Sequence, residues 1–214
     1  MQEIQYYVID TETNGLCSKN HYHEINEISI IRHVDKVQLS KQVVTIHPER
    51  SSIDALRVCK KTLDDLRIGI QPSESVDICN KFLESDGAPS TFRCIVGHNI
   101  INFDRKFLWQ HWEAQGKLFP ADLWLDTMEM ARFWVKKNEL KQANGKKALV
   151  NLMAVCETLG LKKFAGVHAA KADVRNTYSV WQEFIKLGVD HLKFMKNLPH
   201  LVETNSNDDE LLDL

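Results

Sequence analysis

The sequence predicts an α/β protein built on a mixed β-sheet, with helices packed on both of its faces. Three observations support this fold class. The first quarter of the chain holds strand-like segments joined by short polar links, as in a meander. Further along, strand-like segments alternate with segments of helical periodicity. One of these strand-like segments, residues 92–99 (FRCIVGHN), is largely apolar up to Gly97, which is typical of a central strand covered on both faces.

Three strands are expected before residue 50. EISIIRH and KQVVTIH are rich in the β-branched residues that favour strands, and YYVI precedes them. The expected strands are residues 4–11, 27–33 and 41–47.

The rest of the chain is expected to alternate helices and strands. The best helical pattern has Val174, Tyr178, Trp181 and Ile185 on one face. Glycine follows several of the expected helices, where it can end them. The expected helices are residues 75–85, 103–115, 128–135, 148–159, 169–187 and a short one at 190–196, and the expected strands are 92–99 and 123–126.

Length and composition indicate one globular domain. The chain has 214 residues, of which 43% are hydrophobic and 26% are charged, and its formal net charge is −2. We expect one folded domain at residues 1–198, followed by an acidic tail at 199–214. No apolar run reaches about 18 residues, and no signal peptide is recognised, so no membrane contact is expected. The five scattered cysteines predict a reduced, cytoplasmic protein without a zinc site.

Two acids follow the first expected strand in VIDTETNGL. Side chains alternate along a strand, so Asp10 and Glu12 share one face while Ile9 and Thr11 share the other. Like charges this close repel each other unless a cation intervenes. A single Asp-x-Glu is more often a solvated strand end than a metal site, so the pair needs support from the rest of the chain.

Further acids follow other elements. Asp104 is placed in the first turn of a helix after the central strand, where the helix dipole favours a negative charge. His168 and Asp173 are separated by about 140° on an ideal helix. We therefore expect His168 in the preceding loop and Asp173 in the first helical turns.

Together these residues predict a metal-dependent site. Carboxylate oxygens are hard ligands suited to Mg²⁺ or Mn²⁺, and two such ions can clamp a phosphodiester during in-line displacement. A loop histidine is a suitable group to take the proton from water. The predicted ligands are Asp10, Glu12, Asp104 and Asp173, with His168 as the base.

These motifs resemble those of the DEDDh branch of the 3′–5′ exonucleases, in the DnaQ-like superfamily. The motifs occur in order as DTETNGL, HNIINFDRKFL and HAAKADVRNT, and the resemblance runs from about residue 4 to residue 187. It implies a ribonuclease H-like fold. It also implies release of nucleoside 5′-monophosphates from single-stranded or frayed 3′ ends, in replication, repair or proofreading.

The resemblance also implies a role for each motif residue. Asp10, Glu12 and Asp173 would hold the first of two divalent metal ions, with Asp10 bridging to the second and Asp104 acting on that second ion largely through water. His168 would be the general base. The residues that would contact the terminal nucleotide are Thr11, Thr13, Leu16 and Asn99.

Substrate and partners stay open at this stage. DNA is favoured because the resemblance is strongest to DNA-directed members, and RNA trimming is the alternative. A non-catalytic binding module would be expected to lack a motif carboxylate, and all four are present. Residues 132–147 are rich in Lys and Arg, which fits either a solvated surface or a path for a single strand, with Trp134 available for base stacking. The terminal DDELLDL suggests either a replication-partner peptide or a plain disordered end.

Overall fold

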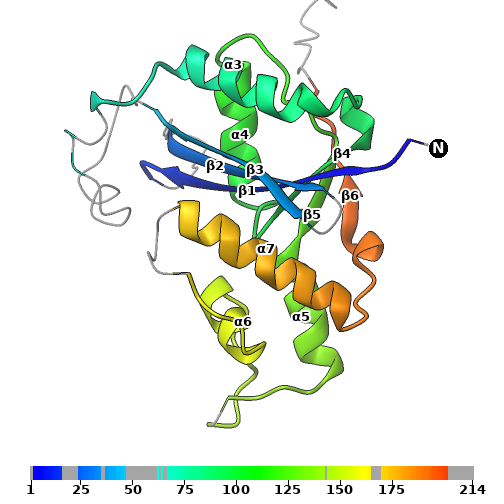
Figure 1. The fold of residues 1–214 in the computed structure, drawn as a ribbon. Helices are drawn as coiled ribbons and strands as arrows, with labels where there is room; N and C mark the ends of the chain where they lie inside the picture. Colours follow the sequence, from blue (N-terminus) through cyan, green and yellow to red (C-terminus); the bar gives the residue numbers. More distant parts are fainter. Residues whose placement is uncertain are drawn as a thin grey trace, which may run out of the picture.

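The computed structural model describes residues 2–15, 24–34, 37–46, 62, 64, 67–142, 144–164 and 170–201. Its centre is a six-stranded mixed sheet in the order β3-β2-β1-β4-β5-β6 (Figure 1). The strands are β1 Gln5–Thr13, β2 Ile25–Val34, β3 Val37–Thr45, β4 Arg93–Gly97, β5 Leu123–Asp126 and β6 Met195–Asn197. The β1–β4 and β4–β5 pairs are parallel, and the other three pairs are antiparallel.

Helices cover both faces of the sheet, which confirms the predicted fold class (Figure 1). The helices are α3 Pro72–Leu83, α4 Asp104–Glu113, α5 Thr127–Lys137, α6 Leu152–Thr158 and α7 Ala170–Lys186, with 3₁₀ turns η1 Glu84–Asp86, η2 Ser90–Phe92 and η3 His191–Phe194. α3 and α4 pack on the face that carries Tyr7 and Ile9. α5, α6 and α7 pack on the opposite face, which carries Val8. Side chains of β1 alternate between the two faces of the sheet, so this strand contributes to two separate hydrophobic cores.

The predicted elements are present, with shifts at several ends. β3 starts four residues before its predicted start, and α6 starts four residues after its own because Asn151 caps it by accepting a hydrogen bond from the Ala154 N–H.

The predicted helix at 190–196 is wrong. Asp190 caps only the short turn η3, and the chain then becomes β6, which pairs with β5 through residues 195–197. β5 offers an edge with unpaired backbone groups, and three residues of chain are enough to satisfy it.

The packed chain reaches at least His200, two residues past the predicted domain boundary. The His200 ring stacks on Trp109, and its Nδ1 accepts a hydrogen bond from the Phe119 N–H. Most of the predicted tail, residues 202–214, lies outside the described residues. Among the described residues, no helix is long and apolar enough to cross a membrane. Cys79, Cys94 and Cys156 are free thiols buried in the structure.

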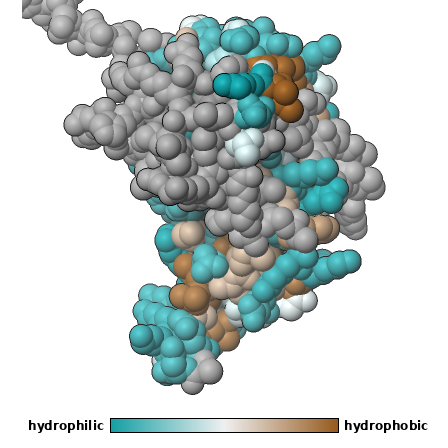
Figure 2. Space-filling model, turned by 90° about the vertical axis from the view of Figure 1, so that its left-hand side faces the viewer, coloured by the Kyte–Doolittle hydropathy of each residue, from teal (hydrophilic) through white to brown (hydrophobic). Residues whose placement is uncertain are grey.

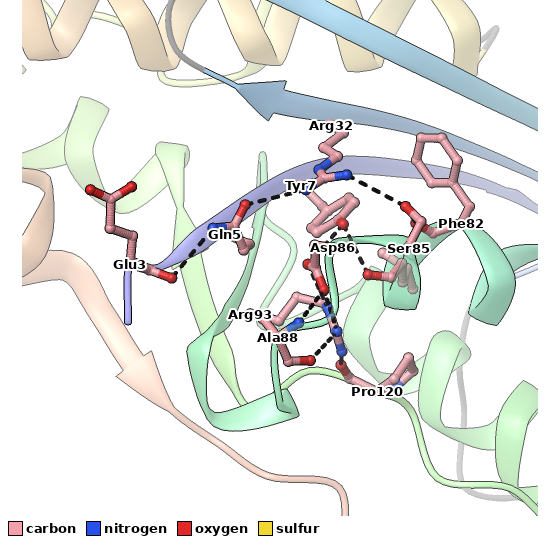
Figure 3. A network of polar contacts seen from close by, with 11 residues as sticks. Glu3, Gln5, Tyr7, Arg32, Phe82, Ser85, Asp86, Ala88, Arg93 and Pro120 are labelled. Carbon is pink, nitrogen blue, oxygen red and sulfur yellow. Dashed lines mark hydrogen bonds and ion pairs between the residues drawn. The ribbon is translucent and has the colours of Figure 1, made fainter. Parts of the chain in front are cut away.

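A buried polar network surrounds Arg93, the first residue of β4 (Figure 3). The Arg93 guanidinium donates to both oxygens of Asp86, and its side chain is 2% exposed. It also donates to the carbonyls of Ala88 and Pro120, while the Tyr7 hydroxyl donates to Asp86. Hydrogen bonds from Arg93, Ala88 and Tyr7 outweigh the effect of burial and lower the pKa of Asp86.

Candidate metal centre

Three of the predicted ligands meet at the opposite edge of the sheet from this network. Asp10 and Glu12 lie near the end of β1, and Asp173 lies in the first turn of α7. One carboxylate oxygen of each lies within 4.8 Å of the other two. Glu12 is buried, whereas Asp10 and Asp173 are half-buried. This cluster of hard oxygen donors fits a divalent metal ion.

The electrostatics of the cluster agree with that fit. The pKa of Asp10 lies well above its ordinary value, first because the group is buried and then because the charges of Asp104, Asp173, Glu12 and Glu27 repel its own. Gathering these carboxylates costs free energy in the absence of a cation. A bound divalent ion would relieve that repulsion.

Asp104 lies beside the triad but is held by different contacts. It is the first residue of α4 and is 5% exposed. Its Oδ1 accepts hydrogen bonds from both the backbone N–H (3.1 Å) and the hydroxyl (2.7 Å) of Thr11. Burial raises the pKa of Asp104 to about 6, and the Thr11 hydrogen bonds oppose this rise. Thr11 is itself buried, and its hydroxyl already has Asp104 as a hydrogen-bond partner within the protein.

The loop between β4 and α4 is fixed by Asp126, the last residue of β5. Its carboxylate accepts hydrogen bonds from the N–H groups of Asn99 (2.8 Å), Met128 (2.9 Å) and Ile101 (3.4 Å). Asn99 adopts a left-handed backbone with φ of 66°, which asparagine tolerates better than most residues. Asp126 therefore positions the turn that carries Asn99 and leads directly to Asp104.

Sequence reasoning missed Glu27 as a fifth carboxylate of this edge. In the β1–β2 pair Glu27 lies directly opposite Glu12, and its charge contributes to the raised pKa of Asp10. The signal was present, because β2 is antiparallel to β1 and an acid in EINEISI must face some part of β1.

Of the remaining predicted site residues, the structure describes only some. Thr13 is half-buried and donates its hydroxyl hydrogen to the Gly15 carbonyl at 2.8 Å. Leu16 and His168 lie outside the described residues, so the predicted terminal-base contact and general base stay predictions.

A mixed sheet flanked by helices, with carboxylates gathered where a central strand ends, is the arrangement of a ribonuclease H-like fold. A family model described as exonuclease, RNase_T, matches residues 7–181, and the chain belongs to this family of the DnaQ-like DEDD superfamily. A comparison with curated proteins finds no match.

Solved structures of Exonuclease I share the fold. The E. coli enzyme in complex with a dT13 oligonucleotide has 16% identity and a TM-score of 0.69, covering 86% of this chain and 41% of that one. The zinc-bound E. coli complex with single-stranded DNA has 15% identity and a TM-score of 0.73, covering 90% and 43%. Exonuclease I from Methylocaldum szegediense has 18% identity and a TM-score of 0.71, covering 89% and 42%. This chain therefore spans about two-fifths of the length of each.

Proposed function

We propose that the protein is a metal-dependent 3′–5′ exonuclease that releases nucleoside 5′-monophosphates from single-stranded or frayed DNA ends. The observation that carries this proposal is the meeting of Asp10, Glu12 and Asp173 within 4.8 Å at one edge of an exonuclease-family fold. The products follow from the chemistry: water adds to the terminal phosphorus, the bond to the leaving 3′ oxygen breaks, and the shortened strand keeps a 3′-hydroxyl.

In this proposal Asp10, Glu12 and Asp173 would hold a first divalent ion, and Asp10 and Asp104 would face a second one. The ions are Mg²⁺ or Mn²⁺, which prefer carboxylate ligands. The chemistry that a bound divalent ion supplies here is acidification of water and stabilisation of charge on the phosphate. Thr11 orients Asp104 through its two hydrogen bonds, which also oppose the rise in the pKa of Asp104 that burial causes.

The other predicted residues act on the proton and on the strand. His168 takes the proton from the attacking water, which requires a neutral imidazole. Leu16 and Thr13 seat the terminal nucleotide, with Asn99 contacting it from the turn that Asp126 fixes. Thr11 acts in two ways in this proposal. Its hydrogen bonds hold Asp104 in place, and its backbone lies beside the terminal nucleotide.

DNA is the proposed substrate, and RNA trimming by the same site is the second candidate. The structures of E. coli Exonuclease I carry single-stranded DNA oligonucleotides, which supports a DNA strand for this fold. The same two-ion chemistry hydrolyses either polymer, so the preference has to be measured. We further propose that the predicted acidic tail, residues 199–214, is the segment that binds a replication partner.

The test is stepwise degradation of 5′-labelled single-stranded DNA and RNA of equal length and sequence. We expect a ladder of products that shortens from the 3′ end in Mg²⁺ or Mn²⁺, faster on DNA, and no products in EDTA. Asp173→Asn should remove the activity. Asp77→Asn, which changes an exposed acid on α3, is the matched control and should retain it. Cleavage in EDTA, or full activity of Asp173→Asn, would contradict the proposal.

A further inference from the structure

The described residues of the connection from α5 to α6 form a hairpin, which we call the lysine hairpin (residues 140–142 and 144–148). Lys141 and Lys147 form an antiparallel bridge. Gln142 donates its backbone N–H to the Lys146 carbonyl and its side-chain amide to the Lys147 carbonyl, both at 2.7 Å. Gly145 has φ of 78° at the turn. These contacts give the lysines of this segment a fixed backbone.

The hairpin and the last turns of α5 carry a concentration of positive charge. Residues 132–147 include six exposed basic residues and only one acid, Glu139, although the formal net charge of the whole chain is −2. Some lysines elsewhere form ion pairs, such as Lys186 with Glu183 and Lys196 with Glu129. Within the described part of the chain, no ion pair involves any of the six. They are Arg132, Lys136, Lys137, Lys141, Lys146 and Lys147.

The base of the hairpin is tied to the edge of the sheet that carries the candidate site. Val150 follows the hairpin, and its carbonyl accepts a hydrogen bond from His98 Nε2 at 2.8 Å. His98 follows β4 directly and precedes Asn99, and its Nδ1 lies 2.9 Å from the Thr127 hydroxyl. Burial lowers the pKa of His98 to about 4, so this neutral ring holds the hairpin base near neutral pH.

The figures agree with this arrangement. In Figure 1 the connection between α5 and α6 lies on the α7 side of the sheet, and α7 begins at the edge where β1 ends. Figure 2 views the molecule from that edge and shows hydrophilic residues gathered at the lower end of the same face. The hydrophilic region and the edge where β1 ends therefore lie on the same side of the molecule.

Charge is the main feature that this surface offers to a strand. The Trp134 ring, which was a candidate for base stacking, packs toward the core and contacts Phe184. Lysine side chains bind phosphates without reading bases. The surface therefore fits the phosphate backbone of a strand of any sequence.

We propose that the lysine hairpin and the basic end of α5 bind the phosphate backbone of single-stranded nucleic acid upstream of its 3′-terminal nucleotide. This proposal rests on the proposed exonuclease function. Metal ions at the carboxylates would act only on the terminal phosphate, so attraction for the rest of the strand has to come from another surface. The lysine hairpin supplies it from the α7 side of the sheet, and Val150, which follows the hairpin, is bonded to His98.

The test compares Lys146→Gln/Lys147→Gln with the control Lys81→Gln/Lys117→Gln, which changes two lysines on the α3–α4 side of the sheet. Gln keeps the backbone groups that build the hairpin. Affinity for labelled dT20 and rU20 is measured by fluorescence anisotropy in Ca²⁺ over a range of salt concentrations, and hydrolysis of dT3 and dT20 is measured in Mg²⁺.

We expect the hairpin variant to bind both 20-mers about tenfold more weakly at low salt, with a salt slope reduced by about 1.4, since each lost phosphate contact on a single strand lowers it by about 0.7. Hydrolysis of dT3 should stay within about twofold of wild type, because so short a strand does not reach the hairpin. Unchanged affinity and slope, with wild type binding and cleaving, would overturn the hairpin proposal alone. A wild type that cleaves neither polymer would instead overturn the proposed function.

Discussion

The two ends of the β1–β4 strand pair both bury acids, and the fold treats them in opposite ways. At the start of β4, Asp86 is paired with Arg93 and its pKa is lowered. At the end of β1, Asp10 faces other carboxylates and its pKa is raised. At the first end the chain supplies its own cation and gains stability. At the second end it gathers like charges, which is useful only if a cation arrives from solution.

The largest effect should come from removing a charge at the candidate site. We expect Asp10→Asn to lower exonuclease activity by at least about 10³-fold, because ion-bound phosphate chemistry depends on several kcal/mol of charge stabilisation. The same change should raise the melting temperature of the metal-free protein, since it removes a repelling charge. Single-turnover cleavage and thermal melting in EDTA check the two parts. A variant that is both active and less stable would contradict the comparison.

Removing the acid at the other end should do the reverse. Asp86→Ala leaves the buried Arg93 guanidinium without its carboxylate, which typically costs about 3–5 kcal/mol in the free energy of unfolding. Urea denaturation measures this loss. Activity per folded molecule, assayed well below the melting temperature, should stay near that of wild type. A loss of activity at full folding would show that the network reaches the site.

Removing the candidate base should slow the reaction and leave substrate affinity and stability unchanged. We expect His168→Ala to slow the chemical step by about 10²–10⁴-fold, without changing oligonucleotide affinity in Ca²⁺ or stability in EDTA. Single-turnover rates and anisotropy separate the two. Lost affinity with an unchanged rate of chemistry would remove His168 from the role of base.

The pH dependence of stability should be smaller and should differ between the two ends. In metal-free protein the pKa of Asp104 is about 6, so its stabilising protonation is complete below about pH 4 and is lost as pH rises through 6. The lowered pKa of Asp86 gives the opposite dependence, with its contribution lost only as pH falls below the ordinary carboxyl range. His98 and His111, with pKa values of about 4, also favour folding as pH rises.

The difference between wild type and Asp104→Asn isolates the site carboxylate from these histidines. Between about pH 5 and 7 in EDTA, the stability of Asp104→Asn relative to wild type should rise by about 1–3 kcal/mol. Urea denaturation at several pH values checks it, and a constant difference would show that Asp104 does not titrate in this range.

Much of the site could be predicted from the sequence because local periodicity decides it. Alternation on β1 places Asp10 and Glu12 on one face, and the helical pattern places Asp173 in the first turn of α7. Asp104 was placed in the right turn, but its hydrogen bonds with Thr11 depend on the parallel β1–β4 pairing, which periodicity does not specify.

What the sequence hid was long-range pairing. Arg93 stands within an otherwise apolar stretch, FRCIVG, and Asp86 directly follows the expected helix 75–85, so their ion pair was not predicted. Glu27 joins the acidic edge only through the register of β1 and β2. β6 is a strand because β5 offers it an edge, and a three-residue segment carries no periodicity of its own.

The central claim is that the gathered carboxylates await a cation, whereas Asp86 already has one. The most direct test is the melting temperature of wild type, Asp10→Asn and Asp86→Asn in EDTA and then in increasing Mn²⁺. Binding to the folded state alone should raise the melting temperature of wild type in a saturable way. We expect the same rise in Asp86→Asn from a lower starting temperature, and little or no rise in Asp10→Asn from a higher one. An absent rise in wild type, or an equal rise in Asp10→Asn, would contradict the account.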